Sequence, residues 1–244
     1  MSVLAIIPAR GGSKGIVRKN IATLAGRPLI AYTLDAVRAS KVVTDILIST
    51  DDDEIIAMCK SLGVAMPYRR PAELGGDNVG MVETVLDALD WWSRREGREP
   101  ELIVLLQPTS PLRSAEDIDG TVTALRAGGK SSAISVHEMH EHPMECVRAN
   151  GGSWSLLEKP PEGANRRQDY AARFQFINGA VYAVTPDFLR SRRAFMTEGH
   201  ETALYIMDAI RGLDIDDPED LDLAEAILNH PRLKARLQRQ LQSA

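Results

Sequence analysis

The chain has 244 residues, with 29 Lys and Arg against 34 Asp and Glu, so its formal net charge is −5. An acidic balance argues against a general nucleic-acid-binding protein, because such a surface is broadly basic. No apolar run approaches the roughly 18 residues of a membrane span, and the start of the chain lacks a signal-peptide pattern. Its two distant cysteines predict neither a disulfide framework nor a zinc site. We therefore expect a cytoplasmic protein that binds neither nucleic acid nor membrane.

The charges are unevenly distributed along the chain. Residues 1–34 contain five basic residues and no acidic residue, so the rest of the chain is clearly acidic. A short basic segment on an acidic protein favours a local anion site over a long groove for a polyanion.

Strand and helix signals alternate along the first half of the chain. Apolar runs predict buried strands at residues 3–7, 46–49 and 102–106. The helical spacing of apolar residues predicts helices that begin near residues 28, 51, 81 and 114, the last with a capping box. Such repeated units are typical of a doubly wound, mostly parallel, Rossmann-like α/β sheet, which binds ligands at the carboxyl ends of its strands.

The second half of the chain is less regular. Between residues 137 and 176, Gly, Asn, Pro and charged residues dominate, with one strand-like piece at residues 154–157. We expect this insertion to be a lid or an arm that contacts a second subunit. Further strands are predicted at residues 133–136, 178–184, 203–207 and 213–215, and closing helices at residues 219–228 and 231–241.

The strongest motif directly follows the first predicted strand, where residues 8–15 read PARGGSKG. Its glycines let backbone N–H groups approach an anion closely, and Arg10, Lys14 and the nearby Lys19 add positive charge. The spacing fits neither the P-loop nor the dinucleotide fingerprint. The motif is therefore either a cradle for a triphosphate or a flexible basic turn.

A second loop, residues 107–113 (QPTSPLR), follows the predicted strand at residues 102–106. Its two prolines stiffen it, so the amide of Gln107 and the hydroxyl groups can be held toward a ligand. The alternative is a simple turn that carries a helix cap.

Two acidic residues precede the closing helices. In a strand, Asp214 and Asp216 would project from one face and could hold a divalent cation together with phosphate oxygens. The alternative is an acidic run that caps the helix after Pro218.

Other clusters carry weaker signals. The arginine pairs at residues 69–70 and 166–167 are interpreted as solvated unless they face one cleft. His137, His140 and His142 are not interpreted as a metal site, because they lie in the irregular insertion without evident carboxylate–His geometry.

Together, these motifs resemble those of the acylneuraminate cytidylyltransferases, also called CMP-sialic acid synthetases, and their legionaminate- and pseudaminate-type relatives. The resemblance rests on residues 7–15, 19–20, 70–74, 107–113, 178–182 and 214–216, which follow the family order along nearly the whole chain. It implies transfer of CMP from CTP to the anomeric hydroxyl of a nine-carbon keto-sugar acid, with release of pyrophosphate and a requirement for Mg2+. It also implies a fold of the nucleotide-diphospho-sugar transferase type. Residues 1–137 and 177–244 would form the body, and residues 138–176 an arm that pairs two subunits as a homodimer.

The resemblance also implies roles for individual residues. The catalytic residues would be Arg10, Lys14 and Gln107. The nucleotide-binding residues would be Arg10, Gly11, Gly12, Ser13, Lys14, Lys19, Asn20, Arg70 and Ser110. The sugar-binding residues would be Gln107, Arg167, Asn178 and Tyr182, and the metal ligands would be Asp214 and Asp216. No side chain is assigned as a general base.

Two positions depart from the family members that act on N-acetylneuraminate. Those members tend to have Arg where this chain has Phe176, and Lys where it has Glu145. Loss of a cation that binds the sugar carboxylate should weaken the binding of N-acetylneuraminate, so a related nonulosonate of the legionaminate or pseudaminate type fits as well or better. The alternatives are a nucleotidyltransferase for another nucleotide or sugar, and a nucleotide-binding regulator without catalysis. An NAD-binding protein is disfavoured because its glycine fingerprint is missing.

Overall fold

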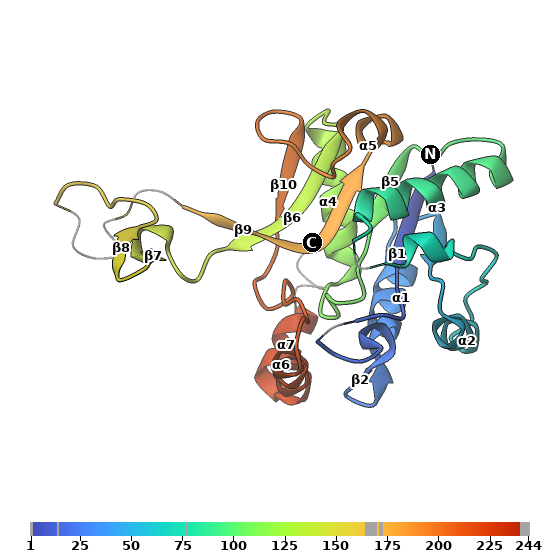
Figure 1. Ribbon diagram of the computed structural model, residues 1–244, viewed down its shortest axis with the longest axis horizontal. Helices are drawn as coiled ribbons and strands as arrows, with labels where there is room; N and C mark the ends of the chain where they lie inside the picture. Colours follow the sequence, from blue (N-terminus) through green and yellow to red (C-terminus); the bar gives the residue numbers. More distant parts are fainter. Residues whose placement is uncertain (1, 14, 77, 164–169, 171–172, 240–244) are drawn as a thin grey trace.

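The computed structural model describes residues 2–13, 15–76, 78–163, 170 and 173–239 (Figure 1). A six-stranded sheet runs through the body in the order β10-β6-β9-β5-β1-β4. Its strands are β1 (Val3–Pro8), β4 (Asp45–Ser49), β5 (Leu102–Leu105), β6 (Ser132–Glu138), β9 (Gln175–Val184) and β10 (Thr202–Ile206). β9 pairs antiparallel with β5 and β6, and the other pairings are parallel. The predicted mostly parallel α/β sheet is therefore confirmed.

Helices cover both faces of the sheet, because alternate residues of each central strand point to opposite sides. Leu4 and Ile6 of β1 lie in one apolar cluster with residues of α3 and α5. Ala5, between them, lies in a second cluster with residues of α1 and α4. The helices are α1 (Leu29–Ala39), α2 (Asp53–Ser61), α3 (Met81–Glu96), α4 (Ala115–Ala127), α5 (Pro186–Arg192), α6 (Pro218–Asn229) and α7 (Pro231–Arg239). Short elements are η1 (Lys19–Ile21), η2 (Ala72–Leu74), β2 (Thr23–Leu24) and β3 (Arg27–Pro28).

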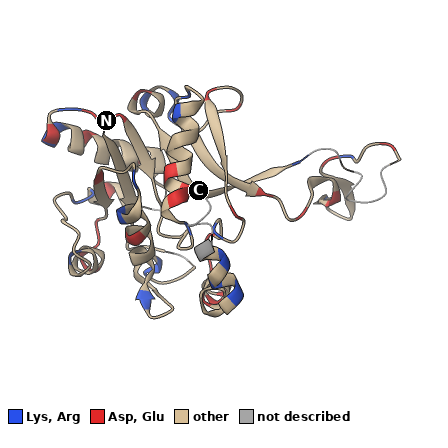
Figure 2. Ribbon diagram, turned by 180° about the vertical axis from the view of Figure 1, so that it is seen from behind, with Lys and Arg blue, Asp and Glu red and all other residues tan. Residues whose placement is uncertain are grey.

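Charge lies mainly on the outside of this body. The charged residues of the six strands are Asp45, at the start of β4, and Glu138, at the end of β6. Most other Lys, Arg, Asp and Glu positions lie on helices and loops (Figure 2). Within the described residues, no helix is both long enough and apolar enough to cross a bilayer.

A slender arm leaves the body where β6 ends and β9 begins (Figure 1). It carries η3 (Pro143–Glu145) and a hairpin of β7 (Val147–Asn150) and β8 (Ser153–Leu156). The strand-like piece predicted at residues 154–157 is thus confirmed, shifted by one residue. Because β6 runs parallel to β5, the arm leaves from the edge of the sheet at which β1, β4 and β5 end.

β9 begins three residues earlier than predicted and contains an irregularity. Ile134 of β6 pairs with Tyr182, but Val136 already pairs with Ile177, so residues 178–181 bulge from the ladder. Gly179 has a φ of +71°, a conformation that glycine adopts without strain. We refer to residues 178–181 as the β9 bulge.

The strand predicted at residues 213–215 is wrong. This segment joins no sheet, and the Ile215 N–H donates to the Thr109 carbonyl oxygen at 2.8 Å. Ile215 is fully buried in a small apolar cluster with Leu24 and Leu29. The segment is therefore attached to the loop after β5 rather than to an edge strand, which no local sequence pattern could predict.

Candidate active site

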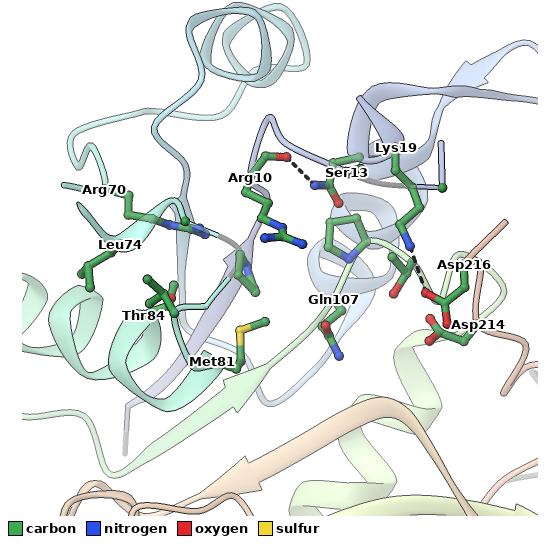
Figure 3. A pocket seen from close by; sticks show the side chains of 17 residues that line it. Arg10, Ser13, Lys19, Arg70, Leu74, Met81, Thr84, Gln107, Asp214 and Asp216 are labelled. Atoms are coloured by element: carbon green, nitrogen blue, oxygen red, sulfur yellow. Dashed lines mark hydrogen bonds and ion pairs between the residues drawn. The ribbon is translucent and has the colours of Figure 1, made fainter. Parts of the chain in front are cut away.

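A cavity of about 490 Å³ opens at the carboxyl ends of β1 and β5 (Figure 3). Pro8 ends β1 and Gln107 follows β5, and both line the cavity. The remaining lining side chains come from residues 10–20, 70–84, 108–109 and 214–216. The volume suits a small-molecule ligand, and this edge of an open α/β sheet is where such ligands bind.

The glycine-rich loop after β1 packs closely against two acidic segments. A Cβ at Gly11 would overlap the Asp52 carboxylate, and a Cβ at Gly15 would lie 2.5 Å from the Asp216 carbonyl oxygen. Both positions therefore need glycine for space rather than for an unusual φ. A Cβ at Gly12 would meet no atom, so room remains above the backbone there.

Asn20 holds the same loop from inside. It is buried, and its Nδ2 donates to the Arg10 carbonyl oxygen at 2.9 Å. Arg10 and Ser13 line the cavity, and the Arg10 guanidinium lies near its middle in Figure 3. Lys14, which we predicted to bind phosphate, lies outside the described residues. Asn20 thus positions the main chain from which Arg10 reaches into the cavity.

Arg70 forms another part of the wall. Its Nε donates to Ser49 Oγ at 3.0 Å, and a terminal nitrogen donates to the Ser49 carbonyl oxygen at 2.5 Å. Burial lowers the pKa of Arg70. Leu74 and Met81 also line the cavity, and their apolar surface suits a nucleoside better than a phosphate.

Asp214 and Asp216 line the cavity beside Lys19 (Figure 3). The Lys19 Nζ donates to Asp216 Oδ1 at 3.0 Å and to the Ile215 carbonyl oxygen at 2.7 Å. Asp214 is the more buried carboxylate, and its Oδ1 has no hydrogen-bond partner among the described residues. Burial raises the pKa of Asp214, although a hydrogen bond from Thr109 opposes this shift. The pair was predicted to share one face of a strand; the structure brings both to the cavity without a strand.

The two carboxylates fit a hard divalent cation. Asp214 offers an oxygen without a donor, and the Asp216 side chain is 80% exposed. Mg2+ is usually held by one or two carboxylates together with substrate phosphates. In the described part of the chain, His, Cys, Asp and Glu side chains form no group of three or more that could hold a metal ion. The other ligands would then be phosphate oxygens and water.

A buried arginine ties the loop after β5 to the β9 bulge. Arg113 donates to the carbonyl oxygens of Gln107 at 3.2 Å and Ala180 at 2.7 Å, and to Thr33 Oγ1 at 2.7 Å. Burial lowers the pKa of Arg113 to about 10. No role is assigned to this residue from the sequence, although it ends the motif at residues 107–113. The available signal was its position directly before the capping residue Ser114.

The predicted sugar-binding and nucleotide-binding residues are not all brought together. Gln107 lines the cavity, whereas Ser110, Asn178 and Tyr182 are not among the residues that line it. Ser110 and Asn178 are buried, and Tyr182 is half-buried. Arg167 lies outside the described residues. Among the described residues, the cavity lining therefore includes most of the predicted nucleotide-binding residues and both predicted metal ligands. Of the predicted sugar-binding residues it includes Gln107.

The fold and the cavity together define the class of the protein. A mostly parallel α/β sheet that carries a basic glycine-rich loop and an acidic pair at its carboxyl edge has the parts needed for nucleotidyl transfer. The chain belongs to the cytidylyltransferase family, whose model matches residues 4–230. The resemblance inferred from the motifs is confirmed at this level.

Several relatives carry the names of enzymes that make CMP-sugars. The chain is 32% identical to CMP-N,N'-diacetyllegionaminic acid synthase of Legionella pneumophila, over 93% of this chain and 97% of that protein. It is 30% identical to an N-acylneuraminate cytidylyltransferase of Escherichia coli over 92% of its own length, but it spans only 52% of that relative. A CMP:2-keto-3-deoxy-manno-octonic acid synthetase solved with CTP has a TM-score of 0.69 at 18% identity, covering 93% of this chain and 98% of that one. This last likeness concerns the fold alone.

Proposed function

We propose that this protein transfers CMP from CTP to the anomeric hydroxyl of a nonulosonic acid and releases pyrophosphate. The observation that carries the proposal is one cavity lined by the basic loop around Arg10, by Gln107, and by the acidic pair Asp214 and Asp216. A regulator without catalysis would not need an unpartnered buried carboxylate oxygen in its nucleotide cavity, because such a group costs stability.

The chemistry requires alignment and charge neutralisation more than covalent help. The anomeric hydroxyl is a weak nucleophile, and the α-phosphorus is surrounded by negative oxygens. We assign Arg10 and Lys14 to the phosphate oxygens and the leaving pyrophosphate, and Gln107 to the orientation of the sugar. Arg70 and the apolar wall would receive the nucleoside. No side chain is assigned as a general base.

Asp214 and Asp216 would hold Mg2+. When bound there, the cation supplies neutralisation of phosphate charge and lowers the pKa of an oxygen bound to it. Lys19 already pairs with Asp216, so it would balance the acidic pair and hold the segment in place.

A legionaminate- or pseudaminate-type nonulosonate is the proposed sugar. Phe176 lies at the start of β9, is 51% exposed, and packs on the His137 ring with ring centroids 5.3 Å apart. An aromatic ring at this place cannot bind a sugar carboxylate as an arginine would. The N,N'-diacetyllegionaminate name of the Legionella relative supports the same substrate class.

A homodimer formed through the arm, in the cytoplasm, completes the proposal. The hairpin of β7 and β8 exposes Val147, Trp154 and Leu156, with 57%, 69% and 37% of their surface accessible, and the strand register puts all three on one face. Such a cluster of exposed apolar side chains is typical of a surface that meets another protein.

A substrate panel tests the proposed reaction. CTP, UTP, ATP and GTP are combined with N-acetylneuraminate, N,N'-diacetyllegionaminate, a pseudaminate and a hexose phosphate, with or without Mg2+, and pyrophosphate release is measured. We expect release only with CTP, Mg2+ and a nonulosonic acid, and faster release with legionaminate or pseudaminate than with N-acetylneuraminate. Release with GTP or a hexose phosphate, and none with any nonulosonate, would show the proposal to be wrong.

A matched pair of variants tests the metal pair. Asp216→Asn should lose most of the pyrophosphate release, because a metal ligand is removed. Asp222→Asn is the control, since Asp222 is exposed on α6 and not among the cavity-lining residues. Equal activity of the two variants would remove Asp216 from the proposed metal site.

A further inference from the structure

Asn178 sits in the β9 bulge with the orientation of its amide fixed. Its Oδ1 lies 3.1 Å from the Ala180 N–H and 2.7 Å from Ser135 Oγ. A backbone N–H can only donate, so the amide oxygen must face Ala180. A flipped amide would put an NH2 group against that N–H. The amide nitrogen of Asn178 therefore points the other way.

That nitrogen points at His137, near the end of β6. Asn178 Nδ2 and His137 Nδ1 are 3.3 Å apart. An amide NH2 cannot accept a hydrogen bond, so Nδ1 must present its lone pair and the imidazole proton must sit on Nε2. Burial lowers the pKa of His137, which favours this neutral ring, although the charge of Asp208 opposes it. Asp208 itself pairs with Arg236 at 2.7 Å.

The turn that precedes the acidic pair closes over this hydrogen bond. A Cβ at Gly212 would lie 2.7 Å from His137 Nδ1 and 2.8 Å from Asn178 Nδ2. Gly212 therefore has to be glycine for the turn to pack here, two residues before Asp214. On the other side, a Cβ at Gly179 would lie 3.9 Å from Gln107 Nε2. The hydrogen bond between His137 and Asn178 thus lies between the turn at Gly212 and the β9 bulge, which approaches Gln107 at Gly179.

We propose that His137 is a positioning residue for the transfer reaction: its unprotonated Nδ1 holds Asn178, and through it the β9 bulge, beside Gln107. The role rests on the proposed function, because Gln107 is assigned to the sugar. His137 does not line the cavity, so it acts through Asn178 and not on the substrate itself. Nucleotide binding should be independent of it, since Arg10 and Arg70 lie on other segments.

Kinetics of three full-length variants test the role. His137→Leu removes the acceptor and leaves a buried amide N–H unpaired, so the KM for the nonulosonate should rise roughly tenfold while the KM for CTP stays within about twofold. His137→Asn places an oxygen near the position of Nδ1 and should restore the sugar KM. His200→Leu is the matched control, because His200 is exposed in a loop before β10. An unchanged sugar KM in His137→Leu, or equal changes in both KM values, would overturn the proposal.

A measurement without substrate separates this proposal from the proposed function. A long-range 1H–15N spectrum of the full wild-type chain at pH 7.5, assigned with His137→Asn, reports which ring nitrogen of His137 carries the proton. We expect a protonated Nε2 and a bare Nδ1. A proton on Nδ1 would overturn the proposal even if the enzyme is active. If no nonulosonate reacts, the proposed function fails while the spectrum still decides whether His137 can hold Asn178.

Discussion

The strands of the body and the strands of the arm have opposite environments. Every residue of β1 is buried, and β1 carries parallel strands on both sides. Every residue of β7 and β8 is exposed, and the two strands pair only with each other. A two-stranded hairpin has too little apolar burial for stability of its own. The buried strands of the body thus form the cavity edge, whereas the exposed hairpin of the arm is the part that the proposed dimer contact would cover.

A core truncation should have the largest effect on stability. Ile6→Ala in β1 is expected to lower the free energy of unfolding by about 4 kcal/mol, because it leaves a cavity in a fully buried cluster. Val147→Ala in β7 should change it by less than about 0.5 kcal/mol. Urea unfolding followed by circular dichroism measures both. Similar losses in the two variants would show that the arm is as tightly packed as the body.

Removal of the buried Arg113 should have the next largest effect on stability. Arg113→Met leaves the carbonyl oxygens of Gln107 and Ala180 without this donor, so a loss of about 3 kcal/mol in unfolding free energy is expected. Arg148→Met is the control on the exposed β7. The sugar KM of any folded Arg113→Met protein should also rise. A fully stable Arg113→Met variant would contradict the role of Arg113 as a tie between two loops.

Asp214→Asn should lower the rate of pyrophosphate release and raise the stability of the metal-free protein. Loss of a metal ligand is expected to reduce pyrophosphate release by about 100-fold or more. Because burial raises the native pKa of Asp214, ionisation of the native carboxyl destabilises the metal-free protein as pH rises through that pKa. The variant should therefore have the higher Tm at pH 7 without metal, and the difference should vanish as pH falls toward 4. A lower Tm at pH 7 would mean that Asp214 is held by more hydrogen bonds than the structure shows.

A substitution in the arm should have the smallest effect on the stability of the body. Trp154→Ala should leave the unfolding free energy of the body within about 0.5 kcal/mol but weaken the proposed dimer about tenfold. Sedimentation velocity measures the dimer, and Ser155→Ala serves as the neighbouring control. A wild-type chain that remains monomeric at all concentrations would remove the homodimer from the proposal.

The strands and helices of the body could be predicted because the sequence patterns that indicate them extend over only a few residues. The strands at residues 3–7 and 102–106 are short apolar runs between loops, and such runs are buried in parallel sheets whatever lies beside them. The capping box at Ser114 likewise depends on residues three positions apart and is present. The segment at residues 213–215 was predicted wrongly, because its hydrogen-bond partner Thr109 lies about a hundred residues away in the chain.

The same distinction applies to the site. Arg10, Gln107, Asp214 and Asp216 could be selected from residue type and motif, and all four line the cavity. Asn178 was also selected, but the structure turns its amide toward Ser135, Ala180 and His137. His137 gave no signal of this role, because it was assigned to the irregular insertion, whereas the structure places it in β6, paired with Phe176.

The class of sheet, the basic loop after the first strand, the acidic pair and the family could all be predicted from the amino-acid sequence. These depend on residue type and near-neighbour spacing, which act before the chain is folded. Three features appear only in the folded chain: Arg113 is buried, the β9 bulge approaches Gln107, and Gly212 packs against the hydrogen bond between His137 and Asn178. The reason is that burial and hydrogen-bond partners are properties of segments far apart in the chain, and they exist only when the sheet brings those segments to one edge.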